Sequence, residues 1–185
     1  MTACFVTGHR PSGFRYSEQD PRCDKIKSII KTEIIKLYTE CGIRAVWVGG
    51  AIGVDTWAAE IVFELQKQKL YKDLQLFVAI PFPEYGKSFD PDQKQRYLDI
   101  IQKSTKQITL CPLYRPDAFR KRNRYIVDNS ICGIAVFGKG RSVRSGTKMT
   151  LNYAIEKKGL PVTVIDPDSA QVTPSYIREN NSDQT

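Results

Sequence analysis

The sequence has little of what metal sites, membrane spans and exported proteins require. Its 185 residues include a single histidine, and its five cysteines form no C-x-x-C pair, which leaves too few ligands for the usual zinc sites. An odd number of cysteines cannot all pair within one chain, so we expect reduced thiols. No apolar run reaches the roughly 20 residues that cross a bilayer, and no basic segment followed by an apolar one opens the chain. We therefore expect no metal, no membrane span, no signal peptide and a cytoplasmic location.

Two nucleotide-binding fingerprints are absent as well. Neither G-x-G-x-x-G nor G-x-x-x-x-G-K-[ST] occurs, which excludes the standard dinucleotide and P-loop ATPase sites. The composition, 41% hydrophobic and 26% charged, is that of an ordinary globular domain, and a chain of this length buries a substantial core. We predict a single domain over residues 1–167, followed by a polar, loose tail over 168–185.

Positive charge, by contrast, is plentiful and concentrated in one segment. The chain carries a net charge of +8, and the segment from Arg115 to Lys148 holds nine basic against two acidic residues, a net +7. A local excess of one sign favours an anionic partner, although a solvated basic helix face would have the same composition. A nucleic acid bound through this segment is one interpretation, and a phosphorylated small molecule is the other.

Alternating apolar strands and amphipathic helices predict the fold. We expect helices from Asp20-Pro21 to Cys41, from Asp55 onwards, over 91–103 and 118–129, and from Thr147 to Gly159, with Asp20, Asp55 and Thr147 as N-caps. The expected strands lack polar alternation, which indicates that both faces of the sheet are covered. The predicted fold class is therefore α/β: a Rossmann-like open parallel sheet with helices on both faces, in three α/β/α layers. The expected strands are 2–7, 44–48, 74–80, 107–111, 133–137 and 162–165.

Glycine-bearing loops follow three of these strands. Parallel sheets bind ligands at the carboxyl ends of their strands, where "TGHRP", "GGAIGVD" and "GKGRSVRSGT" would lie. The last two also open helices, whose N-terminal N–H groups suit a phosphate. Each loop alone is better explained as a steric connection between strand and helix, but the three at one edge beside a basic segment predict a phosphate-bearing ligand. The candidate binding residues are Gly8, His9, Arg10, Gly49, Gly50, Gly53, Asp55, Arg122, Asn123, Ser145, Gly146 and Thr147.

Three of these side chains have a structural alternative. His9 either stacks on a base or bonds a phosphate, or it only closes the turn after the first strand. Arg10 either clamps a phosphate or forms an ion pair with Asp55 or Asp128. Asp55 is expected to cap its helix rather than to bind a ribose hydroxyl.

The aromatic residues fall into two groups. Trp47 and Trp57 flank the second glycine loop, and we expect both to pack in the core. Phe82, Tyr85 and Phe89 share one loop after the third strand, where one of them is a candidate for stacking on a nucleobase.

Five motifs in a fixed order carry a resemblance to a known family. They are "TGHRP", "GGAIGVDTWAAE", "PFPEYGKSF", "RNRYIVDNS" and "SGTKMTLNYA". Together they resemble the YpsA-like family of the SLOG superfamily of Rossmann-like proteins, over residues 3 to 166. Its relatives include DprA-like DNA-processing proteins, LOG or lysine-decarboxylase-like phosphoribohydrolases, and sensors of nucleotide-derived signals. The resemblance implies a ligand with phosphate and ribose, or a nucleic acid backbone.

One departure from these relatives bears on catalysis. The phosphoribohydrolases carry P-G-G-x-G-T-x-x-E at the last loop, and this chain has Thr150 where the glutamate would fall. Arg122 or Arg124 matches their catalytic arginine. The resemblance thus implies a binding protein, as a sensor or regulatory module, for a nucleotide such as NAD, ADP-ribose or AMP. A phosphoribohydrolase-type or nucleotide-hydrolysing enzyme and a DprA-like nucleic-acid-binding accessory protein are the alternatives, and a homo-oligomer is compatible with each.

Overall fold

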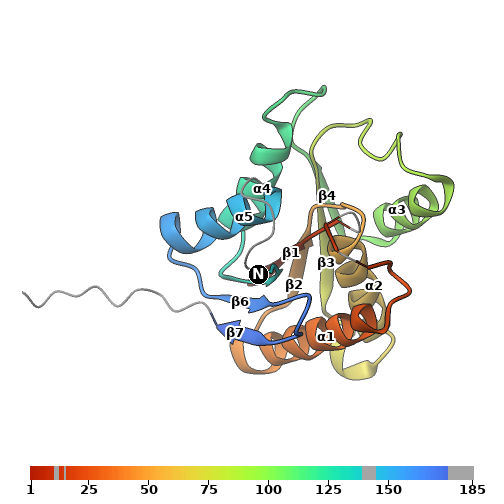
Figure 1. The fold of residues 1–185 in the computed structure, drawn as a ribbon. Helices are drawn as coiled ribbons and strands as arrows, with labels where there is room; N and C mark the ends of the chain where they lie inside the picture. Colours follow the sequence, from red (N-terminus) through yellow and green to blue (C-terminus); the bar gives the residue numbers. More distant parts are fainter. Residues whose placement is uncertain (11–12, 15, 139–144, 175–185) are drawn as a thin grey trace, which may run out of the picture.

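A single seven-stranded sheet lies between two layers of helices (Figure 1). The computed structural model describes residues 1–10, 13–14, 16–138 and 145–174. The strands are β1 (Ala3–Gly8), β2 (Ala45–Val48), β3 (Gln75–Ile80), β4 (Lys106–Thr109), β5 (Cys132–Val136), β6 (Val162–Ile165) and β7 (Val172–Pro174). The helices are α1 (Pro21–Cys41), α2 (Val54–Gln66), α3 (Pro91–Lys103), α4 (Ala118–Asp128) and α5 (Gly146–Asn152), with a 3₁₀ turn η2 (Lys69–Tyr71) and a π-helical turn η3 (Tyr153–Lys157). The predicted three-layer α/β fold is confirmed.

The strand order places a ligand crevice at the middle of the sheet. The order is β4-β3-β2-β1-β5-β6-β7, and every neighbouring pair is parallel except β6 and β7. The chain winds outward from β1 in one direction through β4, then returns to the other side of β1 with β5. The winding therefore reverses between β1 and β5, which is where open parallel sheets form a binding crevice beyond the carboxyl ends of their strands.

The two helical layers bury opposite faces of the sheet. Helices α1, α2 and α3 lie on one side in Figure 1, and α4 and α5 lie on the other. Along β1, Cys4 and Val6 face the α1–α3 layer, whereas Phe5 faces the α4–α5 layer, as the two-residue period of a strand requires. Trp57 is 1% exposed in the first layer and Trp47 is 2% exposed in the second, so both tryptophans lie in the core as predicted.

The helix starts confirm one predicted cap and correct two. Asp20 caps α1, where its carboxylate accepts from the Arg22 N–H. The N-cap of α2 is Gly53 rather than Asp55, and that of α5 is Ser145 rather than Thr147. In each corrected case the helix begins before the predicted cap, so Asp55 and Thr147 lie in the first helical turn.

The C-terminal part of the described chain also differs from expectation. The α-helical hydrogen bonding of α5 ends at Asn152, and η3 carries the helix on to Lys157. Val172–Pro174 pairs with β6 as an antiparallel edge strand, within the segment 168–185 that was expected to be loose; residues 175–185 lie outside the described residues. None of the helices in the described part of the chain is both long enough and apolar enough to cross a membrane.

Candidate functional site

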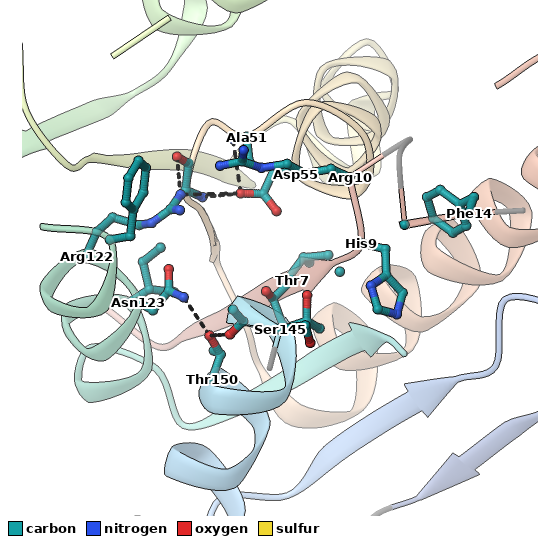
Figure 2. Close-up of a pocket in the computed structure, with 18 residues that line it drawn as sticks. Thr7, His9, Arg10, Phe14, Ala51, Asp55, Arg122, Asn123, Ser145 and Thr150 are labelled. Atoms are coloured by element: carbon teal, nitrogen blue, oxygen red, sulfur yellow. Dashed lines mark hydrogen bonds and ion pairs between the residues drawn. The ribbon is translucent and has the colours of Figure 1, made fainter. Parts of the chain in front are cut away.

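A cavity of about 630 Å³ opens at the carboxyl ends of β1 and β2. It lies at the crevice that the strand order creates, between α4, the start of α5 and the segment after β1 (Figure 2). Every predicted binding residue lines it except Gly50 and Gly53. The predicted residues that the structure brings together there are Gly8, His9, Arg10, Gly49, Asp55, Arg122, Asn123, Ser145, Gly146 and Thr147.

A buried ion pair forms one wall of the cavity. The Asp55 carboxylate lies 3.8 Å from Arg122 Nη1, and both side chains are less than a tenth exposed. Asp55 Oδ2 accepts hydrogen bonds from the backbone N–H groups of Gly49 (2.8 Å) and Ala51 (3.2 Å). Arg122 Nη1 donates to the Gly49 carbonyl. Asp55 and Arg122 therefore hold the loop after β2 against α4.

This arrangement changes the interpretation of the second glycine loop. The N–H groups of Gly49 and Ala51 are occupied by a resident carboxylate, so this loop does not offer them to a phosphate. Gly50 and Gly53 have φ values of 66° and 94°, in the left-handed region that favours glycine, which gives both a backbone role in the turn. The loop after β2 is thus a rigid wall of the cavity, and its glycines serve its geometry.

The start of α5 differs, because the hydrogen bonds among the described residues leave its first two N–H groups unused. The Lys148 N–H is bound by the side chain of Ser145 at 3.1 Å, whereas the N–H groups of Gly146 and Thr147 precede the first intrahelical acceptor. The helical segment behind them continues through η3 to Lys157, so its dipole adds positive potential at this end. The atom nearest to a Cβ built on Gly146 is Asn123 Nδ2, at 3.9 Å, which leaves room above this backbone.

Arg122 lines the same cavity and, in the described part of the chain, has one unpaired donor. The residue is 6% exposed, and its buried Nε has no hydrogen-bond partner within the described residues. Buried polar groups are nearly always paired, so this unpaired donor in a cavity-lining side chain needs an explanation. The sequence marked Arg122 as part of the basic segment and, through the resemblance, as one of two matches to a catalytic arginine; the structure shows that it is the buried arginine of α4.

The alternative ion pairs predicted for Arg10 do not form among the described residues. Among the described residues, the basic partner within 4.0 Å of Asp55 is Arg122, and that of Asp128 is Lys158. The Arg10 side chain lies near Asp55 and Ala51 in Figure 2, and its guanidinium carbon is 5.9 Å from the centroid of the Phe119 ring. Arg10 is exposed, and its charge is therefore available at the mouth of the cavity.

Asp55 is the carboxylate of the cavity wall, and its charge is costly to bury. Burial raises the pKa of Asp55 above its ordinary value of 3.8, and this effect outweighs the opposing influence of Arg122 and of the Gly49 and Ala51 N–H groups. Binding of a further anion near Asp55 would raise the pKa more. An anionic ligand group is therefore favoured at the α5 side of the cavity, away from this carboxylate.

His9 has packing contacts that hold its ring in place. It is 6% exposed and stacks on Phe137 with ring centroids 5.5 Å apart, while Phe14 meets it edge-on at 6.0 Å. Phe14 in turn stacks on Trp57 at 5.4 Å. The His9 ring thus belongs to a row of packed aromatic side chains, and it lines the cavity in an orientation that these contacts hold.

The aromatic loop after β3 does not reach the cavity. Phe82 and Phe89 each pack on Tyr85, and both Tyr85 and Phe89 pack on Tyr97. None of Phe82, Tyr85 and Phe89 lines the wall. Stacking of one of them on a nucleobase in this cavity is therefore not supported. They support Phe119, which packs on both Phe82 and Tyr85 with ring centroids 5.8 Å apart and does line the cavity.

Several lining residues were not predicted as binding residues, and α4 shows the signal that would have found two of them. Phe119 and Ile126 lie three residues before and four residues after Arg122, the spacing that places side chains on one helix face. Thr150 was noted only as the replacement of a glutamate. The lining residues that were missed are Val6, Thr7, Gly13, Phe14, Ala51, Phe119, Ile126 and Thr150.

Across the described ranges, no group of three His, Cys, Asp or Glu side chains is placed to hold a metal ion.

The basic segment from Arg115 to Lys148 does not form one uniform surface. Arg122 is buried, and Asp117 lies 3.3 Å from Arg115 and 3.4 Å from Lys121. Arg120 and Arg124 are exposed. Three further basic residues lie outside the described residues: Lys139, Arg141 and Arg144.

Comparison with known proteins assigns the chain to a family. The sequence profile of the YspA SLOG family matches residues 4–170, which is most of the 185 residues. The chain belongs to the YspA SLOG family. It is also 29% identical over 162 residues to UPF0398 proteins from Bacillus thuringiensis strain Al Hakam and from Bacillus cereus strains AH187 and Q1, covering 86% of this chain and 85% of each relative. The resemblance to YpsA-like SLOG proteins is confirmed, and the match to the YspA SLOG family covers both the cavity and the strands that form it.

Proposed function

We propose that this protein binds a nucleotide or nucleotide-derived ligand in the central cavity, with the phosphate at the start of α5. The proposal rests on the Arg122 guanidinium, which lines the cavity and whose buried Nε has no partner among the described residues. The first two N–H groups of α5, at Gly146 and Thr147, and the exposed Arg10 add donors on the same cavity. Membership of the YspA SLOG family supports the proposal.

A ribose-bearing ligand fits a cavity that has hydrogen-bond donors on one wall and an acceptor on the other. Donors gather at Arg10, Arg122 and α5, whereas the Asp55 carboxylate is an acceptor on the β2 side. A ligand that satisfies both walls has an anionic group and, a short distance away, a hydroxyl or amine that donates. Phosphorylated ribose has both.

The substitution Gly146→Asp tests the phosphate position. Its carboxylate would lie where we place the phosphate, and the nearest atom to the new Cβ is 3.9 Å away, so the fold has room for it. An acidic residue at a helix N-terminus is also favourable for stability. We expect the thermal stabilisation that a bound nucleotide gives the wild type to disappear. The readout is a thermal-shift panel of NAD, ADP-ribose, AMP and ATP.

The matched control is Gly146→Asn, which has the same shape without the charge. It should lose far less affinity than Gly146→Asp if charge repulsion is the cause. Equal binding by wild type and Gly146→Asp would refute the phosphate position. Stabilisation by a single-stranded oligonucleotide alone, falling steeply with salt, would instead favour the nucleic-acid alternative.

Hydrolysis of the bound nucleotide is a second candidate, because the Asp55 carboxylate lines the cavity. A carboxylate beside a ribose stabilises positive charge that develops as a glycosidic bond breaks. The same panel, incubated and then separated by chromatography, would show released base. Asp55→Asn should abolish that release while the nucleotide still gives some thermal stabilisation through its phosphate; an intact nucleotide after incubation with wild type counts against the enzyme.

A further inference from the structure

A second, smaller cavity of about 230 Å³ adjoins the first along α4 and α5. Four residues line both cavities: Phe119, Asn123, Gly146 and Thr150. Gly146, which has no side chain, lies at the boundary, so a ligand whose phosphate sits at the start of α5 can extend into this α4–α5 groove. The inference drawn here rests on the proposed function.

The walls of the α4–α5 groove suit a flat ring. Pro116, Phe119 and Met149 supply apolar surface, and Met149 is 56% exposed although it is apolar. Arg124 and Tyr153 also line the groove, with the Arg124 guanidinium carbon 5.1 Å from the centroid of the Tyr153 ring. A flexible thioether and a cation beside an aromatic ring are both favourable neighbours of a planar, polarisable group.

The hydrogen bonds of Thr150 fix the orientation of the Asn123 amide. The Thr150 hydroxyl has one hydrogen, which it donates to the Gly146 carbonyl at 2.8 Å. It must therefore accept the second bond, from Asn123 Nδ2 at 2.8 Å. The Asn123 carbonyl oxygen then points away from Thr150, as Figure 2 shows. At the boundary of the two cavities, Asn123 consequently presents an acceptor, which selects a ligand group that donates.

We propose that the α4–α5 groove takes the nucleobase of the ligand, and that Asn123 selects a base with an exocyclic amino group. Adenine and cytosine have such a group, whereas hypoxanthine and uracil have a carbonyl oxygen in the same place. A carbonyl facing the Asn123 oxygen would leave two acceptors opposed, which costs the hydrogen bond and the desolvation of both groups.

The experiment compares nucleotides and a base-free probe by calorimetric titration. Wild type should bind AMP roughly tenfold more tightly than IMP, or CMP roughly tenfold more tightly than UMP, the effect of one lost hydrogen bond. Met149→Trp fills the groove with a bulky ring and should weaken binding of the amino nucleotide while leaving ribose 5-phosphate unaffected. Leu113→Trp is the matched control, because Leu113 is 74% exposed and does not line the groove; it should change neither.

The outcomes separate the groove from the phosphate site. If ribose 5-phosphate binds and Met149→Trp leaves nucleotide affinity unchanged, the groove is not the base site and the proposed function survives. Equal affinity within both the AMP–IMP and CMP–UMP pairs overturns the role of Asn123. If wild type binds neither ribose 5-phosphate nor any of the nucleotides, both proposals are overturned.

Discussion

Replacing Arg122 with glutamine should unbalance the buried charges of the cavity wall. Arg122 Nη1 lies 3.8 Å from the Asp55 carboxylate, and their side chains are 7% and 8% exposed. Two unit charges at about 4 Å attract by about 4 kcal/mol at an effective dielectric constant of about 20. Removing one partner of a buried pair usually costs about 3–5 kcal/mol. We therefore expect Arg122→Gln to lower the free energy of unfolding at neutral pH by about 3–5 kcal/mol.

The loss should shrink in mild acid. Burial already raises the pKa of Asp55, and the Arg122 charge is the largest effect that opposes it. Without Arg122 the pKa rises further, so the carboxyl takes up a proton at higher pH and the uncompensated charge disappears. The folded-state pKa of Asp55 lies above its unfolded value. The stability that its neutral carboxyl contributes is therefore present below the unfolded pKa and is lost as pH rises through the folded value. The difference between wild type and variant is therefore largest at neutral pH.

Urea denaturation of four proteins, at neutral and mildly acidic pH, measures both effects. They are wild type, Arg122→Gln, Asp55→Asn and the double variant, which form a double-mutant cycle. Arg124→Gln is the control on the same helix, because Arg124 is exposed and its loss should be small. The reasoning is wrong if Arg122→Gln costs the same free energy in the Asp55→Asn background as in wild type, or if its cost does not change with pH.

Two further substitutions probe a close contact at the cavity and a hydrogen-bonded ion pair among residues that do not line it. A Cβ on Gly8 would lie 2.5–2.8 Å from the Val54 side chain, so Gly8→Ala should cost about 1–3 kcal/mol through overpacking, and adding Val54→Ala should recover part of it in thermal unfolding; no recovery would rule out the close contact as the cause. Burial alone would raise the pKa of Glu18, but the hydrogen bonds that its carboxylate accepts from Arg96 and Trp57 lower the pKa overall. Its contribution to stability is present above the ordinary value of 4.5 and is lost as pH falls through the lowered value. Glu18→Gln should therefore destabilise most at neutral pH, and a pH-independent loss in urea titrations would count against this network.

The sheet was predictable because its signals are local. Apolar runs such as 44–48, and the stripe of Ile26, Ile30 and Ile34 that α1 buries, follow from the period of each element. The edge strand β7 was missed because three residues at the edge of a sheet, with Val172 exposed, leave no pattern to detect. The position of Gly8 at the end of the central strand followed from the winding rule and was enough to locate the cavity.

The site was predictable as a set of loops but not as a set of contacts. Asp55 was expected to be a cap because Asp near a helix start usually is one, whereas its partners are Gly49, Ala51 and a cation on a helix more than sixty residues away. A single sequence has no signal for that distant pairing. The same limit applies to the bond between Asn123 and Thr150, which only the packing of α4 on α5 creates.

A crystal structure with the nucleotide that stabilises the protein most tests the central claim directly. We predict a phosphate oxygen within hydrogen-bond distance of the Gly146 or Thr147 N–H, with the Arg122 guanidinium on the same phosphate or its neighbour. The Asp55 carboxylate should remain on the Gly49 and Ala51 N–H groups. A phosphate that displaces Asp55 from those groups, or a nucleotide bound outside the central cavity, would contradict the account.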